Sequence, residues 1–165
     1  MLSSLFSITP RIRGDSGGIT ATTGWMAELL MLGAAFRRVR VDPVNESVTI
    51  RDRTWWFRRR ERVILFGEVA GVGYGYEEWS WGFWARNPID CFVVSLKLKW
   101  GEEARLFNFV GDGTFTNDGP LPDWMYWKEY AFDMTGTQEQ ESRMFAKVLG
   151  KVLQAPLGPS SLTRE

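Results

Sequence analysis

The sequence predicts a mainly β domain of the α+β class. We expect a strongly bent antiparallel sheet, or a partly open β-barrel or sandwich, of about seven strands capped by one C-terminal amphipathic helix. Short runs of alternating apolar and polar residues, separated by turn residues, indicate the strands. Nine Trp and eleven Phe supply the bulk that a sheet core needs. A helical period appears clearly only near the end of the chain.

The length and composition favour one globular domain with extensions at both ends. The chain has 165 residues, 44% of them hydrophobic and 24% charged, which is typical of a folded protein with its own core. We divide it into an N-terminal arm (1–35), a β domain with its C-terminal helix (36–155) and a flexible tail (156–165). The amino terminus lacks the pattern of a signal peptide.

The arm is rich in Ser, Thr and Gly, and we expect it to be irregular apart from a short strand at Gly18–Thr23. A short apolar helix is predicted over Trp25–Phe36, with Thr23 as its N-cap. Its apolar stretch is too short to span a bilayer. Packing on the domain is the first interpretation of this helix, and contact with a membrane surface is the alternative.

The next segment predicts consecutive antiparallel strands. Phe36–Val41 alternates as a half-buried strand should, and Asp42–Glu46 is a turn. Ser47–Phe57 is expected to resume as strand, with a bulge or a bend at Asp52-Arg53-Thr54 before Trp55-Trp56. Arg58–Glu61 then forms the next hairpin tip, and Arg62–Phe66 the following buried run.

Glu68–Tyr76 is a strand with two unlike faces. Gly71, Gly73 and Gly75 share one parity, whereas Val72, Tyr74 and Tyr76 share the other. The glycine face should let another backbone or a large ring approach closely. The spacing of the glycines is not that of a nucleotide-binding loop.

A Trp-rich loop follows over Glu77–Asp90, and we interpret it as a lid or a binding surface. Cys91–Trp100 is an amphipathic strand that places the thiol opposite the core face, and Ala104–Val110 is its hairpin partner. The segment from Gly111 to Gly136 is long, acidic and rich in turn residues, which is typical of a functional insertion.

The last element is an amphipathic helix over Gln138–Gln154. Thr137 and Gln140 form a capping-box pattern, and Pro156 ends the helix. The apolar stripe comprises Met144, Phe145, Val148, Leu149, Val152 and Leu153. This stripe should cover the open end of the bent sheet.

The order of these elements resembles the pleckstrin-homology superfold, and in particular the small bacterial domains of that type. The resemblance covers roughly residues 36 to 155 and rests on pattern, without a diagnostic motif. In some members of that superfamily, basic residues flanking the first hairpin turn bind phosphoinositide headgroups. Here that turn is acidic at both ends, at Asp42 and Glu46, so the lipid site does not transfer to this chain.

The residue inventory argues against catalysis. The chain has no His, which removes the usual general base and the commonest metal ligand. Its single Cys91 excludes an internal disulfide and lacks a neighbour that would lower its pKa. An enzyme would have to use carboxylates such as Glu77, Glu78, Asp90 or Glu102. We therefore expect no enzyme activity, no catalytic residue, no metal and no cofactor.

Charge is distributed unevenly although the net charge is zero. Nine Arg lie between Arg37 and Arg62, and nine carboxylates lie between Glu102 and Glu141. Our candidate anion or partner contacts are Arg58, Arg59, Arg60 and Arg62, and our candidate aromatic surface or lid comprises Trp79, Trp81, Phe83 and Trp84. The arginines also suit cation–π stacking on neighbouring aromatic residues within the sheet.

These observations predict a soluble, non-catalytic binding or scaffolding module whose partner is a protein or a second copy of the chain. The alternatives are a β-barrel that binds a small apolar ligand and a module that binds a membrane surface or an anionic headgroup. Zero net charge disfavours nucleic acid. We expect a cytoplasmic location, with peripheral attachment at the inner membrane surface as the alternative.

Overall fold

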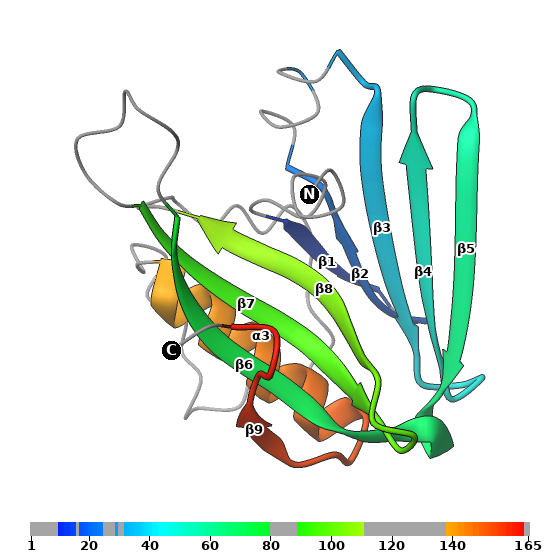
Figure 1. Cartoon of the computed structure of the whole chain (residues 1–165). Coiled ribbons are helices and arrows are strands. Elements are labelled where there is room, and N and C mark those ends of the chain that lie inside the picture. Colours follow the sequence, from blue (N-terminus) through cyan, green and yellow to red (C-terminus); the bar gives the residue numbers. More distant parts are fainter. Residues whose placement is uncertain are drawn as a thin grey trace.

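The computed structural model describes residues 10–15, 17–24, 29, 32–79, 89–110 and 138–163. In this part of the chain, nine strands form two sheets, and helix α3 lies against the second sheet (Figure 1). No described strand of one sheet pairs with a strand of the other, so these strands do not close into a barrel. The prediction of a mainly β fold with a C-terminal helix is confirmed.

The first sheet is an antiparallel meander in which each strand pairs with the next along the chain. Its strands are β1 (Arg11–Asp15), β2 (Gly18–Thr22), β3 (Ala35–Asp42), β4 (Ser47–Thr54) and β5 (Arg58–Leu65). The inner face is apolar where Val39 lies opposite Ile50 and Val41 lies opposite Val48. The outer face carries mainly arginine and threonine, because successive side chains of a strand point to opposite faces.

A short 3₁₀ helix, η1 (Phe66–Glu68), carries the chain from the first sheet into the second. The second sheet has the strand order β8-β7-β6-β9. Its strands are β6 (Val69–Trp79), β7 (Ile89–Leu98), β8 (Glu103–Val110) and β9 (Leu157–Pro159). The β6–β7 and β7–β8 pairs are antiparallel, whereas β9 joins the edge of β6 in parallel.

A bulge in the β7–β8 ladder changes which side chains of β8 share a face. The register shifts between Val94 and Ser95, so that Phe107 lies opposite Val94 while Arg105 lies opposite Ser95. Leu106 is the extra residue between them. One face of the sheet is therefore apolar with Phe107, and the other carries the polar side chains of Ser95 and Arg105.

Helix α3 (Gln138–Val152) covers the apolar face of the second sheet. The ring of Phe145 lies 6.4 Å from that of Phe107 and 6.0 Å from that of Phe109, measured between centroids. Phe145 and Leu149 are buried and Val148 packs against the same core, so the predicted apolar stripe is confirmed. The core is continuous, since inner-face residues of the first sheet belong to the same apolar cluster.

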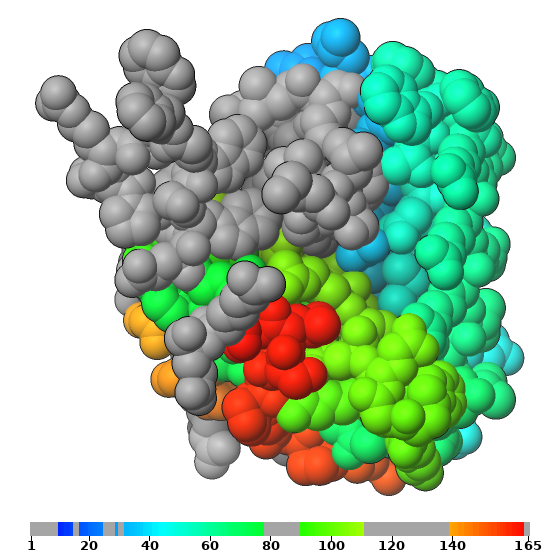
Figure 2. Space-filling model, in the orientation of Figure 1, coloured from blue at the N-terminus to red at the C-terminus, as the bar shows by residue number. Residues whose placement is uncertain are grey.

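The opposite face of the second sheet is covered by the C-terminal segment, residues 157–163. Figure 2 shows these residues, in red, lying over the green strands of this sheet. Strand β9 pairs with β6, and Ser160 is buried with its amide donating to the carbonyl of Tyr74. The predicted close approach at the glycine face of β6 is confirmed, because a Cβ on Gly73 would collide with Glu103 and Ser95, and one on Gly75 with Thr163.

Three boundaries differ from the sequence prediction. Strands β1 and β2 belong to the first sheet, so this part of the predicted N-terminal arm is part of the β domain. The tip of the β4–β5 hairpin is Trp55–Phe57, and Arg58 already lies in β5. The segment predicted as a flexible tail contains β9, since its backbone completes the edge of β6.

Other predictions concern residues outside the described part of the chain. These are half of the helix expected over residues 25–36, residues 80–88 of the Trp-rich loop and the acidic segment 111–136. The described ends of that helix and loop differ from the prediction. Leu32 and Gly33 have left-handed backbone angles and β3 begins at Ala35, so no helix reaches Phe36, and β6 and β7 extend into both ends of the predicted loop. Trp100, the predicted last residue of the strand Cys91–Trp100, lies in the turn after β7 and is 55% exposed. Among the described helices, none is both long and apolar enough to cross a lipid bilayer.

Candidate functional site

The outer face of the first sheet is covered by arginine side chains, because alternate positions of adjacent strands carry them in register. Arg38 lies opposite Arg51, and Arg53 lies opposite Arg59. The complete set, which we call the arginine face, is Arg11, Arg13, Arg38, Arg40, Arg51, Arg53 and Arg59. Adjacent strands are about 4.8 Å apart, so these arginines are closely spaced across the sheet.

Part of this face is already engaged, since Arg11, Arg13 and Arg53 each take part in an interaction. Glu61 pairs with Arg51 at 3.0 Å between Nη2 and Oε1, and both side chains are about half exposed. Asp42 accepts hydrogen bonds from the backbone and side-chain amides of Asn45 and from the amide of Val44, and these bonds together with the charge of Arg40 lower the pKa of its carboxyl group. Among the described residues, no carboxylate forms an ion pair with Arg38, Arg40 or Arg59.

Phe36 supplies an aromatic surface within the arginine face. The guanidinium carbons of Arg38 and Arg53 lie 5.6 and 5.5 Å from the centroid of its ring. A cation over an aromatic ring is attracted by about 0.5–1 kcal/mol at exposed sites. Cation–π stacking was expected between Arg58–Arg62 and the aromatic residues of the hairpin, whereas the contacts found among the described residues join Arg38 and Arg53 to Phe36.

The tip of the β4–β5 hairpin, Trp55–Phe57, presents three aromatic side chains to solvent, and we call it the aromatic tip. Their exposed fractions are 57% for Trp55, 55% for Trp56 and 83% for Phe57. Both tryptophans have left-handed backbone angles, φ 55° and 63°. A bulky residue in that region costs of order 1–2 kcal/mol. Exposed apolar residues held in a strained turn are a common feature of binding sites.

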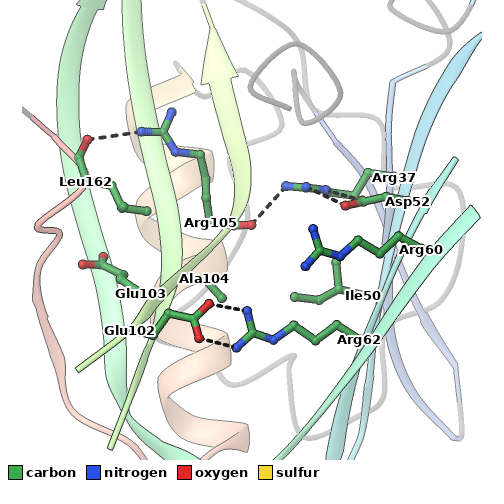
Figure 3. A pocket seen from close by; sticks show the side chains of 10 residues that line it. All are labelled: Arg37, Ile50, Asp52, Arg60, Arg62, Glu102, Glu103, Ala104, Arg105 and Leu162. Atoms are coloured by element: carbon green, nitrogen blue, oxygen red, sulfur yellow. Dashed lines mark hydrogen bonds and ion pairs between the residues drawn. The ribbon is translucent and has the colours of Figure 1, made fainter. Parts of the chain in front are cut away.

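A second feature, which we call the intersheet cavity, lies between the inner face of the first sheet and the edge strand β8 (Figure 3). Its volume is about 450 Å³. The lining comes from β3, β4 and β5 on one side and from residues 102–105 on the other. The side chains that reach it are mainly charged, with Ile50, Ala104 and Leu162 as the apolar part.

Two arginines join the sheets across this cavity. Arg37 binds Asp52 through Nε at 2.7 Å and Nη2 at 2.9 Å, and its Nη1 donates to the carbonyls of Arg105 and Leu106 at 3.0 and 3.2 Å. Arg62 forms a bidentate pair with Glu102 at 2.5 and 2.8 Å. The hydrogen bond from Arg62 lowers the pKa of Glu102 to about 2, so this carboxylate stays ionised at neutral pH.

Glu103 is held on the polar face of the second sheet. Its carboxylate accepts hydrogen bonds from the hydroxyls of Ser95, Ser160 and Ser161 and from the amide of Ser161. Burial alone would raise its pKa, but the bonds from Ser160, Ser161 and Ser95 lower the pKa below its usual value. An ionised Glu103 thus fastens the C-terminal segment to β8.

The structure divides the predicted arginine cluster between two faces. Arg59 points outward, Arg60 points into the intersheet cavity, and Arg62 is bound to Glu102. Arg58 begins β5 and is exposed. The side chains of Trp79, Trp81, Phe83 and Trp84 lie outside the described residues. Arg11, Arg13, Arg38 and Arg40 were missed because their common face depends on the strand register, although their alternation along β1 and β3 was a usable signal.

The groups considered for catalysis are engaged in structural contacts. Glu77 pairs with Arg105 at 2.9 Å, Glu102 pairs with Arg62, and Asp90 accepts a hydrogen bond from the hydroxyl of Tyr76 at 2.8 Å. The side chain of Glu78 is outside the described residues. Within the described chain, no three Cys, Asp or Glu side chains are grouped so that they could hold a metal ion.

Comparisons with known proteins leave these features as the basis for any functional conclusion. The chain matches no protein-family model, no curated protein and no solved structure.

Proposed function

We propose that this protein is a non-catalytic binding module of pleckstrin-homology-like architecture that recognises an acidic protein partner through the arginine face. The element order supports the architectural part: a meander sheet, then the antiparallel strands β6–β8, then a C-terminal helix. The observation that carries the functional part is the set of seven arginines on one face of the first sheet.

Arginine favours carboxylate partners because its planar guanidinium donates two parallel hydrogen bonds to them. The aromatic tip adjoins the same sheet and supplies exposed tryptophan, which together with arginine is enriched in the energetically dominant contacts of protein interfaces. An acidic protein surface with aromatic residues uses both features at once. Self-association through this face is disfavoured, because it would bring two positively charged arginine faces together.

Binding to a synthetic acidic polypeptide tests this proposal. The probe is a Glu–Tyr copolymer, with poly-L-glutamate, single-stranded DNA and phosphatidylserine vesicles as parallel probes at about 0.15 M salt, where long-range attraction is screened. The triple variant Arg38→Gln, Arg40→Gln, Arg59→Gln should bind the copolymer at least about tenfold more weakly, a loss of roughly 1.4 kcal/mol. Trp55→Ala should remove the preference for the copolymer over poly-L-glutamate.

The matched control is the triple variant Arg143→Gln, Lys147→Gln, Lys151→Gln. These residues are exposed on helix α3, away from the first sheet, and their replacement changes the net charge equally. If both triple variants bound the copolymer equally weakly, the loss of affinity would follow from the change in net charge alone, and the proposal would be overturned.

An anionic membrane surface is the second candidate, and the aromatic tip is the observation that favours it. Exposed Trp beside Arg58 and Arg59 is typical of residues that sit at a bilayer interface near acidic headgroups. This candidate would replace the first one under two conditions. The protein would bind the phosphatidylserine vesicles but not the copolymer, and Trp55→Ala and Trp56→Ala would abolish the binding to the vesicles.

A further inference from the structure

The intersheet cavity contains one guanidinium group that the described chain leaves unengaged. Arg37 is bound by Asp52 and two carbonyls, Arg62 by Glu102, and Arg105 by Glu77 and the carbonyl of Leu162. For Arg60, no described carboxylate lies within ion-pair distance. In Figure 3 its guanidinium lies between those of Arg37 and Arg62 and extends toward β8.

The nearby carboxylates make their hydrogen bonds to other groups, although the charge of Arg60 contributes to lowering the pKa of Glu102. Asp52 accepts two hydrogen bonds from Arg37, although it lies directly opposite Arg60 in the β4–β5 ladder. Glu102 accepts from Arg62 and from the indole of Trp100. Glu103 is taken up by the serines of the C-terminal segment and Ser95. The guanidinium of Arg60 therefore faces the cavity without an ion pair or hydrogen bond to a described carboxylate.

The size and lining of the cavity define the class of ligand that fits. A volume of about 450 Å³ falls within the range of roughly 300–1,000 Å³ common for small-molecule sites. One unengaged guanidinium matches one carboxylate, and Ile50, Ala104 and Leu162 offer an apolar wall for a short aliphatic body. A dianion such as phosphate would bring its second charge close to Asp52 and Glu102, which disfavours it.

We propose that the intersheet cavity binds a small aliphatic monocarboxylate, with Arg60 holding the carboxylate and Ile50, Ala104 and Leu162 contacting the aliphatic body. This site is separate from the arginine face and does not depend on it. Arg59 and Arg60 are adjacent in β5 and their side chains point to opposite sides of the sheet.

The test is a ¹H–¹⁵N NMR titration of the arginine side-chain Nε–Hε signals with hexanoate. The neutral 1-hexanol and inorganic phosphate serve as comparison ligands. Saturable shifts are expected with hexanoate at the signal of Arg60, with weaker effects from the other two. The Arg60→Gln variant should bind hexanoate at least about tenfold more weakly, whereas Arg59→Gln, which makes the same charge change on the other face, should bind as the parent does.

The Arg60→Gln variant should fold as the parent does, because Arg60 has no hydrogen bond or ion pair to lose among the described residues. A difference in hexanoate affinity therefore reports on binding and not on folding. A backbone amide spectrum of Arg60→Gln confirms that the fold is kept. Equal hexanoate affinity in Arg60→Gln and the parent would overturn the proposal. So would a loss confined to Arg59→Gln, binding of 1-hexanol as tight as that of hexanoate, or a stronger response to phosphate.

Discussion

At the scale of single residues, Cys91 shows how position determines reactivity. Its side chain is fully buried in strand β7, which lies between β6 and β8 and is antiparallel to both. Burial, and to a smaller extent the charge of Glu77, raise the pKa of the thiol to about 12 against an opposing effect of Arg105. The thiolate is the nucleophilic form, so this cysteine is inert while the protein is folded.

Alkylation by iodoacetamide checks this conclusion. At pH 8 the native protein should show no modification of Cys91, whereas the urea-unfolded chain should react fully. Because the pKa is raised in the folded state, ionisation of the thiol favours unfolding, and the free energy of unfolding should fall as pH rises from about 9 towards 12. Rapid alkylation of the native protein at pH 8 would contradict the burial of this residue.

At the scale of elements, the hairpin β4–β5 and strand β6 show what the sequence can and cannot predict. Period-2 alternation located most of the strands from β3 to β8 and the helical stripe located α3, because burial on one face imposes those periods. The tip was misplaced because Trp-Trp-Phe has high strand propensity and three arginines resemble a polar turn. The position of the tip follows from the strand register. The inner face must hold Val48, Ile50 and Ile64, and the register that achieves this pairs Thr54 with Arg58.

The glycine face of β6 was predicted, but its occupant was not. Nothing local in the segment after Pro156 indicates that it will return to β6, because that contact depends on where α3 ends. The arginine face and the intersheet cavity were beyond prediction for a similar reason. They require the register of five strands and the placement of one sheet on the other.

The contact at Gly73 can be tested by adding one methyl group. The Cβ of Gly73→Ala would collide with Glu103 and Ser95, which are held by the serines of the C-terminal segment. Overpacking of this kind costs about 1–3 kcal/mol, and we expect that loss in urea denaturation together with faster proteolysis of the C-terminal segment. Gly67→Ala is the control, because a Cβ there meets nothing within 4 Å. Equal stability of both variants would show that the side chains of Glu103 and Ser95 are not held against Gly73.

At the scale of the whole molecule, the two sheets are joined by charged side chains as well as by the shared core. Arg37 is the principal link, since one guanidinium binds Asp52 of the first sheet and two backbone carbonyls of β8. The side chains are only 8% exposed for Arg37 and 23% exposed for Asp52. Those carbonyls belong to the bulge of β8, which is the edge strand of the second sheet among the described strands. Relative placement of the sheets, and with it the intersheet cavity, therefore depends on this residue.

Removing Arg37 should destabilise the whole fold, because Asp52 and both carbonyls of β8 would be left without their partner. The expected loss for Arg37→Ala is about 3–5 kcal/mol in the free energy of unfolding, measured by urea denaturation. Arg40→Ala, which removes an exposed arginine of the same strand, should change it by no more than about 0.5 kcal/mol. The double variant Arg37→Met, Asp52→Asn should recover part of the loss, since it removes the stranded charge while keeping volume in the core. If Arg37→Ala were as stable as Arg40→Ala, the apolar core alone would hold the sheets together, and the arginine link would contribute nothing to their placement.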